Sequence, residues 1–241
     1  MRRHLLLPVS AMLVLAAQPA AARSSERKDA EADQDTASTG ALYLTLIREA
    51  RASGRARAAL AYLDDFDRTH AGDAEARVLR VNCLLDLNQV EAARAALGRI
   101  PSGDRSGPAL AVRGHVLAAE GQWPQAAVQY AAALQASPAD AFITNALGYA
   151  RLRSGQAAEA VETLRSAHDL APDDEVVRNN LILALTMTGR LAEADGLLAT
   201  AGDAKAKAQL RQQVAGEVAK LASAGAGAGI SGGAGAGRAG S

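Results

Sequence analysis

Beyond residues 1–22, two pairs of adjacent carboxylates and three histidines are the side chains whose grouping or type most suggests acid–base chemistry or metal binding. They are Asp64–Asp65, Asp173–Asp174, His70, His115 and His168. The histidines have no metal-ligand spacing, and the sequence has no H-E-x-x-H, G-x-S-x-G or phosphate-loop motif. Asp173 and Asp174 directly follow Pro172, where acidic side chains typically cap the start of a helix. The pattern favours capping over catalysis, and we predict neither an enzyme nor a cofactor or metal site.

Two further features resemble known sites but fit them poorly. Gly227 to Gly232 spells G-x-G-x-x-G, but this dinucleotide motif needs a strand before it and a helix after it, and here it lies in a Gly/Ala-rich tail. Cys83 is the only cysteine, which excludes an intramolecular disulfide and a cysteine-based metal site, and its apolar neighbours predict burial. Lys plus Arg and Asp plus Glu both total 26, so no net charge favours nucleic acid.

A different set of polar residues recurs at helical spacing. Asn145 and Asn179 each lie ten residues before a glycine, Gly155 or Gly189, and helical periodicity places them on a stripe with other large or polar side chains. The stripes are Phe142, Asn145, Tyr149, Leu152 and Arg153, then Val176, Asn179, Leu183, Thr186 and Met187, with Arg48, Arg51, Asn82 and His115 as earlier counterparts. An amide both donates and accepts hydrogen bonds, as the backbone of an extended peptide does.

The glycines belong to a repeat of 34 residues. The sequence aligns on Gly121, Gly155 and Gly189, and two weaker copies centre on Gly54 and Asn88. After each of these three glycines, alanine stands at the fifth and twelfth positions and a bulky residue at the ninth. Proline stands at the seventeenth position after Gly121 and Gly155, as Pro138 and Pro172. Glycine or asparagine supplies a left-handed turn between two helices, and proline ends the second helix. Each helix pair leaves an apolar face for the next, so the period predicts an all-α stack.

This pattern resembles the tetratricopeptide repeat family over residues 40–206. The resemblance implies an all-α, right-handed superhelical solenoid of about five helix pairs plus a capping helix over residues 203–222. It also implies that the stripe lines a concave groove for a partner's peptide or helix. The groove residues predicted in this way are Arg48, Arg51, Asn82, His115, Phe142, Asn145, Tyr149, Arg153, Asn179 and Leu183.

The asparagines have a second interpretation. Each could bond the next repeat and fix the stacking register. We favour that interpretation for Asn180 and the groove for Asn145 and Asn179.

A narrower resemblance lies in NALGYARLRSG (145–155), AHDLAPDDEVVRNNLILALTMTGRLAEA (167–194) and LRQQVA (210–215). These segments resemble TadD-type proteins of the tight adherence (Flp) pilus assembly system. The resemblance implies a non-enzymatic scaffold that binds an envelope protein during pilus or secretion-apparatus assembly. The alternatives are a recruiting subunit of a cell-wall or envelope enzyme complex and a self-assembling repeat protein. Partner identity and oligomeric state stay open.

The two ends of the sequence differ from its middle in composition. Residues 1–22 have paired arginines, a short apolar core and Ala20–Ala22 before Arg23, a pattern that predicts a signal peptide. The chain is then expected to reach the periplasm through Sec or twin-arginine export. TadD-type proteins are usually lipid-anchored, but no cysteine directly follows that core, so the sequence itself predicts no lipid anchor. Residues 23–39 are polar and predict a disordered lead-in, residues 40–222 the folded domain, and residues 223–241 a flexible tail.

Overall fold

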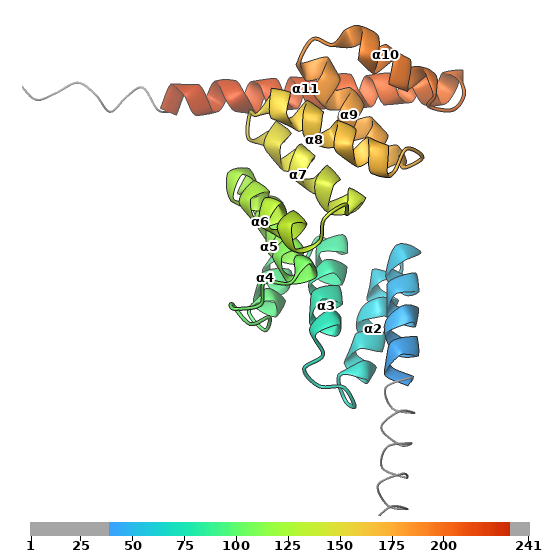
Figure 1. The fold of residues 1–241 in the computed structure, drawn as a ribbon, viewed down its shortest axis with the longest axis vertical. Coiled ribbons are helices and arrows are strands. Elements are labelled where there is room, and N and C mark those ends of the chain that lie inside the picture. The colour runs from blue at the N-terminus through green and yellow to red at the C-terminus, as the bar shows by residue number, and fades with distance from the viewer. Residues whose placement is uncertain (1–38, 232–241) are drawn as a thin grey trace, which may run out of the picture. The chain divides into compact units, whose positions relative to one another are not determined.

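Helices make up every element of residues 39–231, the part of the chain that the computed structural model describes (Figure 1). The predicted signal peptide, residues 1–22, lies outside this range, as do residues 23–38 and 232–241. Residues 39–52 are helical. The helices that follow are α2 (Ala56–Phe66), α3 (Ala74–Asp86), α4 (Val90–Leu97), α5 (Gly107–Ala119), α6 (Trp123–Ala136), α7 (Ala141–Arg153), α8 (Ala157–Leu170), α9 (Glu175–Met187), α10 (Leu191–Ala199) and α11 (Ala204–Ser231).

The chain divides into two compact units between Thr45 and Leu46. Of the first unit the structure describes residues 39–45, where the hydroxyl of Thr45 donates to the carbonyl of Ala41 at 3.0 Å. The second unit contains α2 to α11 and all of the predicted groove residues.

The turns inside the helix pairs lie where the 34-residue period places them. Gly54, Gly121, Gly155 and Gly189 have φ between +72° and +80°, and Asn88 has φ of +56°. A β-carbon penalises this left-handed conformation, and asparagine tolerates it better than most residues. The five predicted helix pairs are therefore confirmed, with α3, α5, α7 and α9 each the first helix of its pair.

Aspartates cap three of the first helices, α3, α7 and α9. The carboxylates of Asp73, Asp140 and Asp174 accept the backbone N–H of the residue three positions later, at 2.7, 3.0 and 2.9 Å, at the starts of α3, α7 and α9. Asp203 does the same for α11 at 2.8 Å. Each such cap stabilises its helix by about 1 kcal/mol. The capping role predicted for Asp174 is confirmed. In the other carboxylate pair, Asp64 forms an ion pair with Arg80 at 2.8 Å and Asp65 one with Arg68 at 2.9 Å.

Small residues allow the two helices of a pair to approach closely. A β-carbon at Gly114 would lie 2.5 Å from the Tyr130 ring, and one at Gly148 would lie 2.5 Å from Cγ of Leu164. Contacts this short do not occur, so each glycine provides the space into which the bulky side chain of the second helix packs. Cys83 is fully buried, and burial raises the pKa of its thiol to about 11, as expected of a core cysteine.

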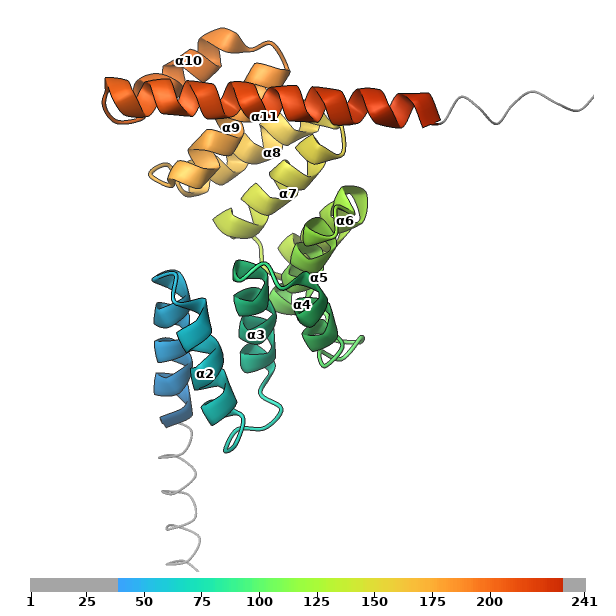
Figure 2. The same ribbon diagram turned by 180° about the vertical axis from the view of Figure 1, so that it is seen from behind.

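The last helix is longer than the sequence predicts. Both ribbon views show α11 lying across α9, and it continues through Ser231 rather than ending at residue 222 (Figures 1 and 2). Its buried Leu210 and half-buried Val214, Val218 and Leu221 pack on the core of α8, α9 and α10. The predicted boundary rested on the Gly/Ala composition of the tail. Extending an existing helix costs far less than nucleating one, so composition alone places such a boundary poorly.

Candidate functional site

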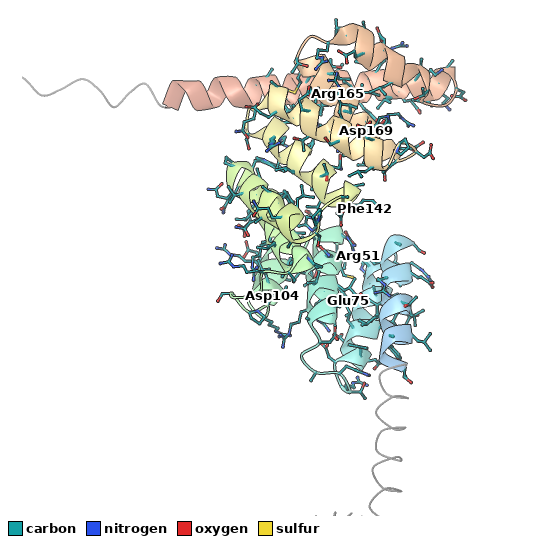
Figure 3. The ribbon with its side chains drawn as sticks, in the orientation of Figure 1. Arg51, Glu75, Asp104, Phe142, Arg165 and Asp169 are labelled. Atoms are coloured by element: carbon teal, nitrogen blue, oxygen red, sulfur yellow. The ribbon has the colours of Figure 1, made fainter. Side chains whose placement is uncertain are left out.

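The predicted arginines at the N-terminal end of the stripe are already paired. Arg48 forms an ion pair with Glu75, and Arg51 contacts both carboxylate oxygens of Asp86 at 2.7 and 3.2 Å. Figure 3 labels Arg51 on the helix before α2 and Glu75 on α3. A pocket of about 620 Å³ is lined by both arginines and by Asp86. An acidic ligand would therefore have to compete with carboxylates of the chain itself for either arginine.

The next two stripe residues contact each other across neighbouring repeats. Nδ1 of His115 on α5 lies 3.1 Å from Oδ1 of Asn82 on α3, and the His115 ring lies 5.5 Å from the ring of Tyr130. With Arg51 these residues line a pocket of about 340 Å³. Burial, with a smaller contribution from the positive charge of Arg51, lowers the pKa of His115 to about 4. The ring is thus neutral at neutral pH, and its Nδ1–H can donate to Asn82.

Acid is expected to destabilise the chain through His115. The unfolded chain takes up this proton near pH 6.5, whereas the folded ring resists it until about pH 4. The unfolded state then binds more protons in this window, so the free energy of unfolding falls as the pH is lowered through it. Urea unfolding at about pH 7 and about pH 4.5 measures the loss, which should be smaller in His115→Gln. An equal loss in both proteins would show that another group is responsible.

The asparagines of α7 and α9 are arranged differently from the prediction. Nδ2 of Asn180 donates to Oδ1 of Asn145 at 2.9 Å. Asn180 therefore makes the inter-repeat contact that we favoured for it, and its partner is Asn145, for which we favoured the groove over such a contact. Oδ1 of Asn179 is buried and has no hydrogen-bond donor among the described residues. These two equivalent positions thus have different roles in the free chain.

Alanine at these two positions should give opposite results. Asn145→Ala removes the acceptor of Asn180, and a half-buried amide left without its partner costs about 1–3 kcal/mol of unfolding free energy. Asn179→Ala removes an unsatisfied buried oxygen and raises helix propensity, so stability should hold or rise. Chemical denaturation of both variants decides this. Equal losses would mean that Asn179 also has an internal partner.

The C-terminal end of the stripe combines exposed apolar side chains with an aromatic cluster. Phe142, labelled in Figure 3, lies in the first turn of α7. It is 73% exposed, and Val176, its equivalent in α9, is 62% exposed. Tyr149 packs edge-on against Trp123 with 5.7 Å between ring centroids. The Arg153 guanidinium lies 4.3 Å from the Trp123 ring centroid, and its Nη1 donates to the Tyr149 hydroxyl at 3.3 Å.

Two residues of this region were misjudged or missed from sequence. Leu183 is 5% exposed, so in this structure it packs in the core and presents little surface to a ligand. Trp123 was not predicted because it begins α6, the second helix of its pair, and the stripe was read on first helices alone. The one feature of the sequence that could have drawn attention to Trp123 is that it is the only tryptophan in the chain.

Comparison with known families decides the identity of the repeat. The tetratricopeptide repeat model matches residues 50–112 and 151–215, which together are more than half of the chain.

The chain belongs to the tetratricopeptide repeat family.

Solved structures share this tetratricopeptide repeat fold. A thermophilic tetratricopeptide repeat protein of Thermus thermophilus superposes with a TM-score of 0.62 at 23% identity, over 73% of this chain and 97% of that one. PilF of Pseudomonas aeruginosa superposes with a TM-score of 0.61 at 16% identity, over 79% and 90%. No curated protein matches significantly. At these identities the matches show a common fold, and they confirm the all-helical repeat array.

The described part of this tetratricopeptide repeat protein has no cluster of metal ligands and no membrane-spanning helix. Within residues 39–231, no three histidine, cysteine, aspartate or glutamate residues come together in a way that could hold a metal ion. Among the same residues, no helix is both long and apolar enough to cross a membrane. Tetratricopeptide repeat proteins are typically non-enzymatic scaffolds for protein–protein interactions.

Proposed function

We propose that this protein is an exported, non-enzymatic scaffold that binds a peptide or helix of another envelope protein on the stripe of its first helices. The proposal rests chiefly on Phe142 and Val176, which occupy equivalent positions on the neighbouring helices α7 and α9 and are both exposed. Exposed apolar groups of this size at consecutive repeats give a partner two apolar contact points on neighbouring helices. Tyr149 and Arg153 of the same stripe of α7 supply aromatic and cationic groups beside it.

We further propose that the partner belongs to a pilus or secretion apparatus. This part is supported by the resemblance of residues 145–155, 167–194 and 210–215 to TadD-type proteins. Export is supported by the signal-like residues 1–22, and N-terminal sequencing of the chain from an envelope fraction should begin at Arg23. A chain that retains residues before Arg23, or that carries a lipid, would contradict this.

Partner capture tests the proposed surface. Phe142→Ser combined with Val176→Ser should reduce capture of the partner from periplasmic extract by about ten-fold or more, as loss of two central apolar contacts commonly does. Both side chains are exposed, so unfolding free energy should change by less than about 0.5 kcal/mol each. The matched control is Val128→Ser with Leu191→Ser, two exposed apolar residues on second helices, 64% and 57% exposed.

The identity of the captured protein distinguishes the alternatives. Mass spectrometry that returns pilus or secretion components supports the assembly role, and a wall-modifying enzyme would support a recruiting subunit. Recovery of the chain itself, with particle size that grows with concentration, would support self-assembly. Equal capture by the groove variant and the control variant would exclude the stripe as the binding surface.

A further inference from the structure

One face of α7 joins the exposed apolar surface to a single cation. Phe142, Asn145, Tyr149 and Arg153 are spaced by three or four residues, so they share that face over roughly 16 Å of helix. Phe142 lies at the exposed end of this face and Arg153 at the other. Asn145 is engaged with Asn180, which leaves Arg153 as the charged group of the face.

The guanidinium of Arg153 is held in place before any ligand arrives. It stacks on Trp123 at 4.3 Å and donates to the Tyr149 hydroxyl, and its side chain remains 28% exposed. Stacking uses the planar face of the group and leaves its edge donors available for a carboxylate. A positioned guanidinium loses little freedom when it binds an anion, which favours affinity.

A carboxylate of the chain already lies near this guanidinium. Oε1 of Glu217 on α11 is 4.0 Å from Nη1 of Arg153. That distance is an ion pair without a hydrogen bond, because charge-assisted N–H···O bonds are about 2.7–2.9 Å long. Glu217 is also 3.4 Å from Lys220, so its charge is shared between two cations. A carboxylate that reached hydrogen-bond distance would interact with Arg153 more strongly than Glu217 does.

The helix that carries Glu217 shows what kind of segment fits here. Val214, Val218 and Leu221 of α11 recur at helical spacing and pack on the same core cluster as Tyr149 and Met187 do. Glu217 is next to Val218, at the edge of this apolar face. An amphipathic helix with a glutamate beside its apolar stripe is thus already seated beside Arg153.

We propose that Arg153 receives a glutamate side chain from an amphipathic helix of the partner, and that Glu217 occupies this position in the free chain. The inference rests on the function proposed above and specifies the chemistry of the partner. Partner binding replaces a long ion pair within the chain by a hydrogen-bonded one between chains. The end of α11 then competes with the partner for Arg153.

A peptide titration on the full-length chain tests this exchange. The host is an opened chain with Glu217→Gln, Val218→Ser and Leu221→Ser, which empties Arg153 and weakens the contacts of the last turns of α11. The probe is a synthetic peptide of residues 204–223, and the control peptide differs only by Glu217→Gln. Neither peptide contains tryptophan, so emission from Trp123, the only tryptophan of the chain, reports binding beside Arg153.

The glutamate peptide should bind the opened chain about five-fold more tightly than the glutamine peptide, the difference that one half-exposed ion pair supports. Adding Arg153→Gln to the opened chain should abolish this preference. A host that keeps Glu217 and carries only Val218→Ser and Leu221→Ser should bind the glutamate peptide more weakly, because its Arg153 is still occupied. Circular dichroism confirms that each host is folded, and the single variant Glu217→Gln serves as host if the opened chain is not.

Three results would overturn the proposal. They are equal affinity of the two peptides, a preference that survives Arg153→Gln, and no binding of either peptide. None of these results would contradict the function proposed above, because capture that depends on Phe142 and Val176 can occur without a carboxylate at Arg153. Conversely, a failed capture experiment does not alter the titration, which uses no envelope partner.

Discussion

A chain that ends after Asp203, and so lacks α11, is expected to lose at least about 4 kcal/mol of unfolding free energy and to aggregate. Leu210 is 7% exposed, and Val214, Val218 and Leu221 are half-buried on the same core. Burying such side chains stabilises a protein by up to about 1.5–3 kcal/mol each. A loss of this size is a large part of the 5–15 kcal/mol that is typical of a folded domain. The uncovered faces of α9 and α10 would then be free to associate.

The matched control ends after Ser223. It retains the four apolar side chains of α11 that pack on the core, so its melting temperature should stay close to that of the full chain. Differential scanning calorimetry with light scattering measures both truncations. A fall of several degrees in the control would show that residues 224–241 contribute to the fold. A stable, monodisperse chain ending after Asp203 would mean that α11 is dispensable.

Leu164→Ala is expected to cost about 2–5 kcal/mol of unfolding free energy, the usual range for a fully buried leucine. Leu164 has no exposed surface, and its Cγ lies in the space left by Gly148. Leu170 of the same helix is 45% exposed, so Leu170→Ala should cost less than about 1 kcal/mol. Denaturant unfolding of the two variants compares the same substitution at a buried and an exposed position.

A double-mutant cycle isolates the contact between α7 and α8. Gly148→Ala alone should destabilise the chain by about 1–3 kcal/mol, because its methyl group would overlap Leu164. In the Leu164→Ala background that methyl group enters the vacated space, so the double variant should be more stable than the sum of the single losses predicts. Strict additivity would mean that the two residues do not contact each other in solution.

The sequence predicted what depends on local spacing. The turn residues follow from the period of 34 and from the conformational preference of glycine and asparagine, and all five have positive φ. The cap at Asp174 follows from its place after Pro172. Such features depend on the backbone within one turn of helix, where residue type and position decide the outcome.

The 34-residue period did not predict which side chains contact each other between repeats. Asn145 and Asn180 lie 35 residues apart and meet only because α7 and α9 pack in one particular register. Arg153 and Glu217 are further apart and meet through the length and direction of α11. A period places residues on a face, but the neighbour of each side chain depends on how two faces are offset. The period therefore predicted which helices carry the stripe residues, but it did not predict the side chains that they contact.

The neighbour-to-neighbour packing of the helices bears on how such a chain can change length during evolution. Within the described residues, every substantial helix–helix contact joins elements no more than two positions apart in the order of the chain. Duplication or loss of a 34-residue unit before α7 would therefore rebuild one junction and leave the others unchanged. The pair between Arg153 on α7 and Glu217 on α11 spans a longer interval. A unit gained or lost between these two helices would separate Arg153 from Glu217. Lineages that keep this ion pair should therefore vary in repeat number on the N-terminal side of α7 and keep the segment from α7 to α11 at constant length.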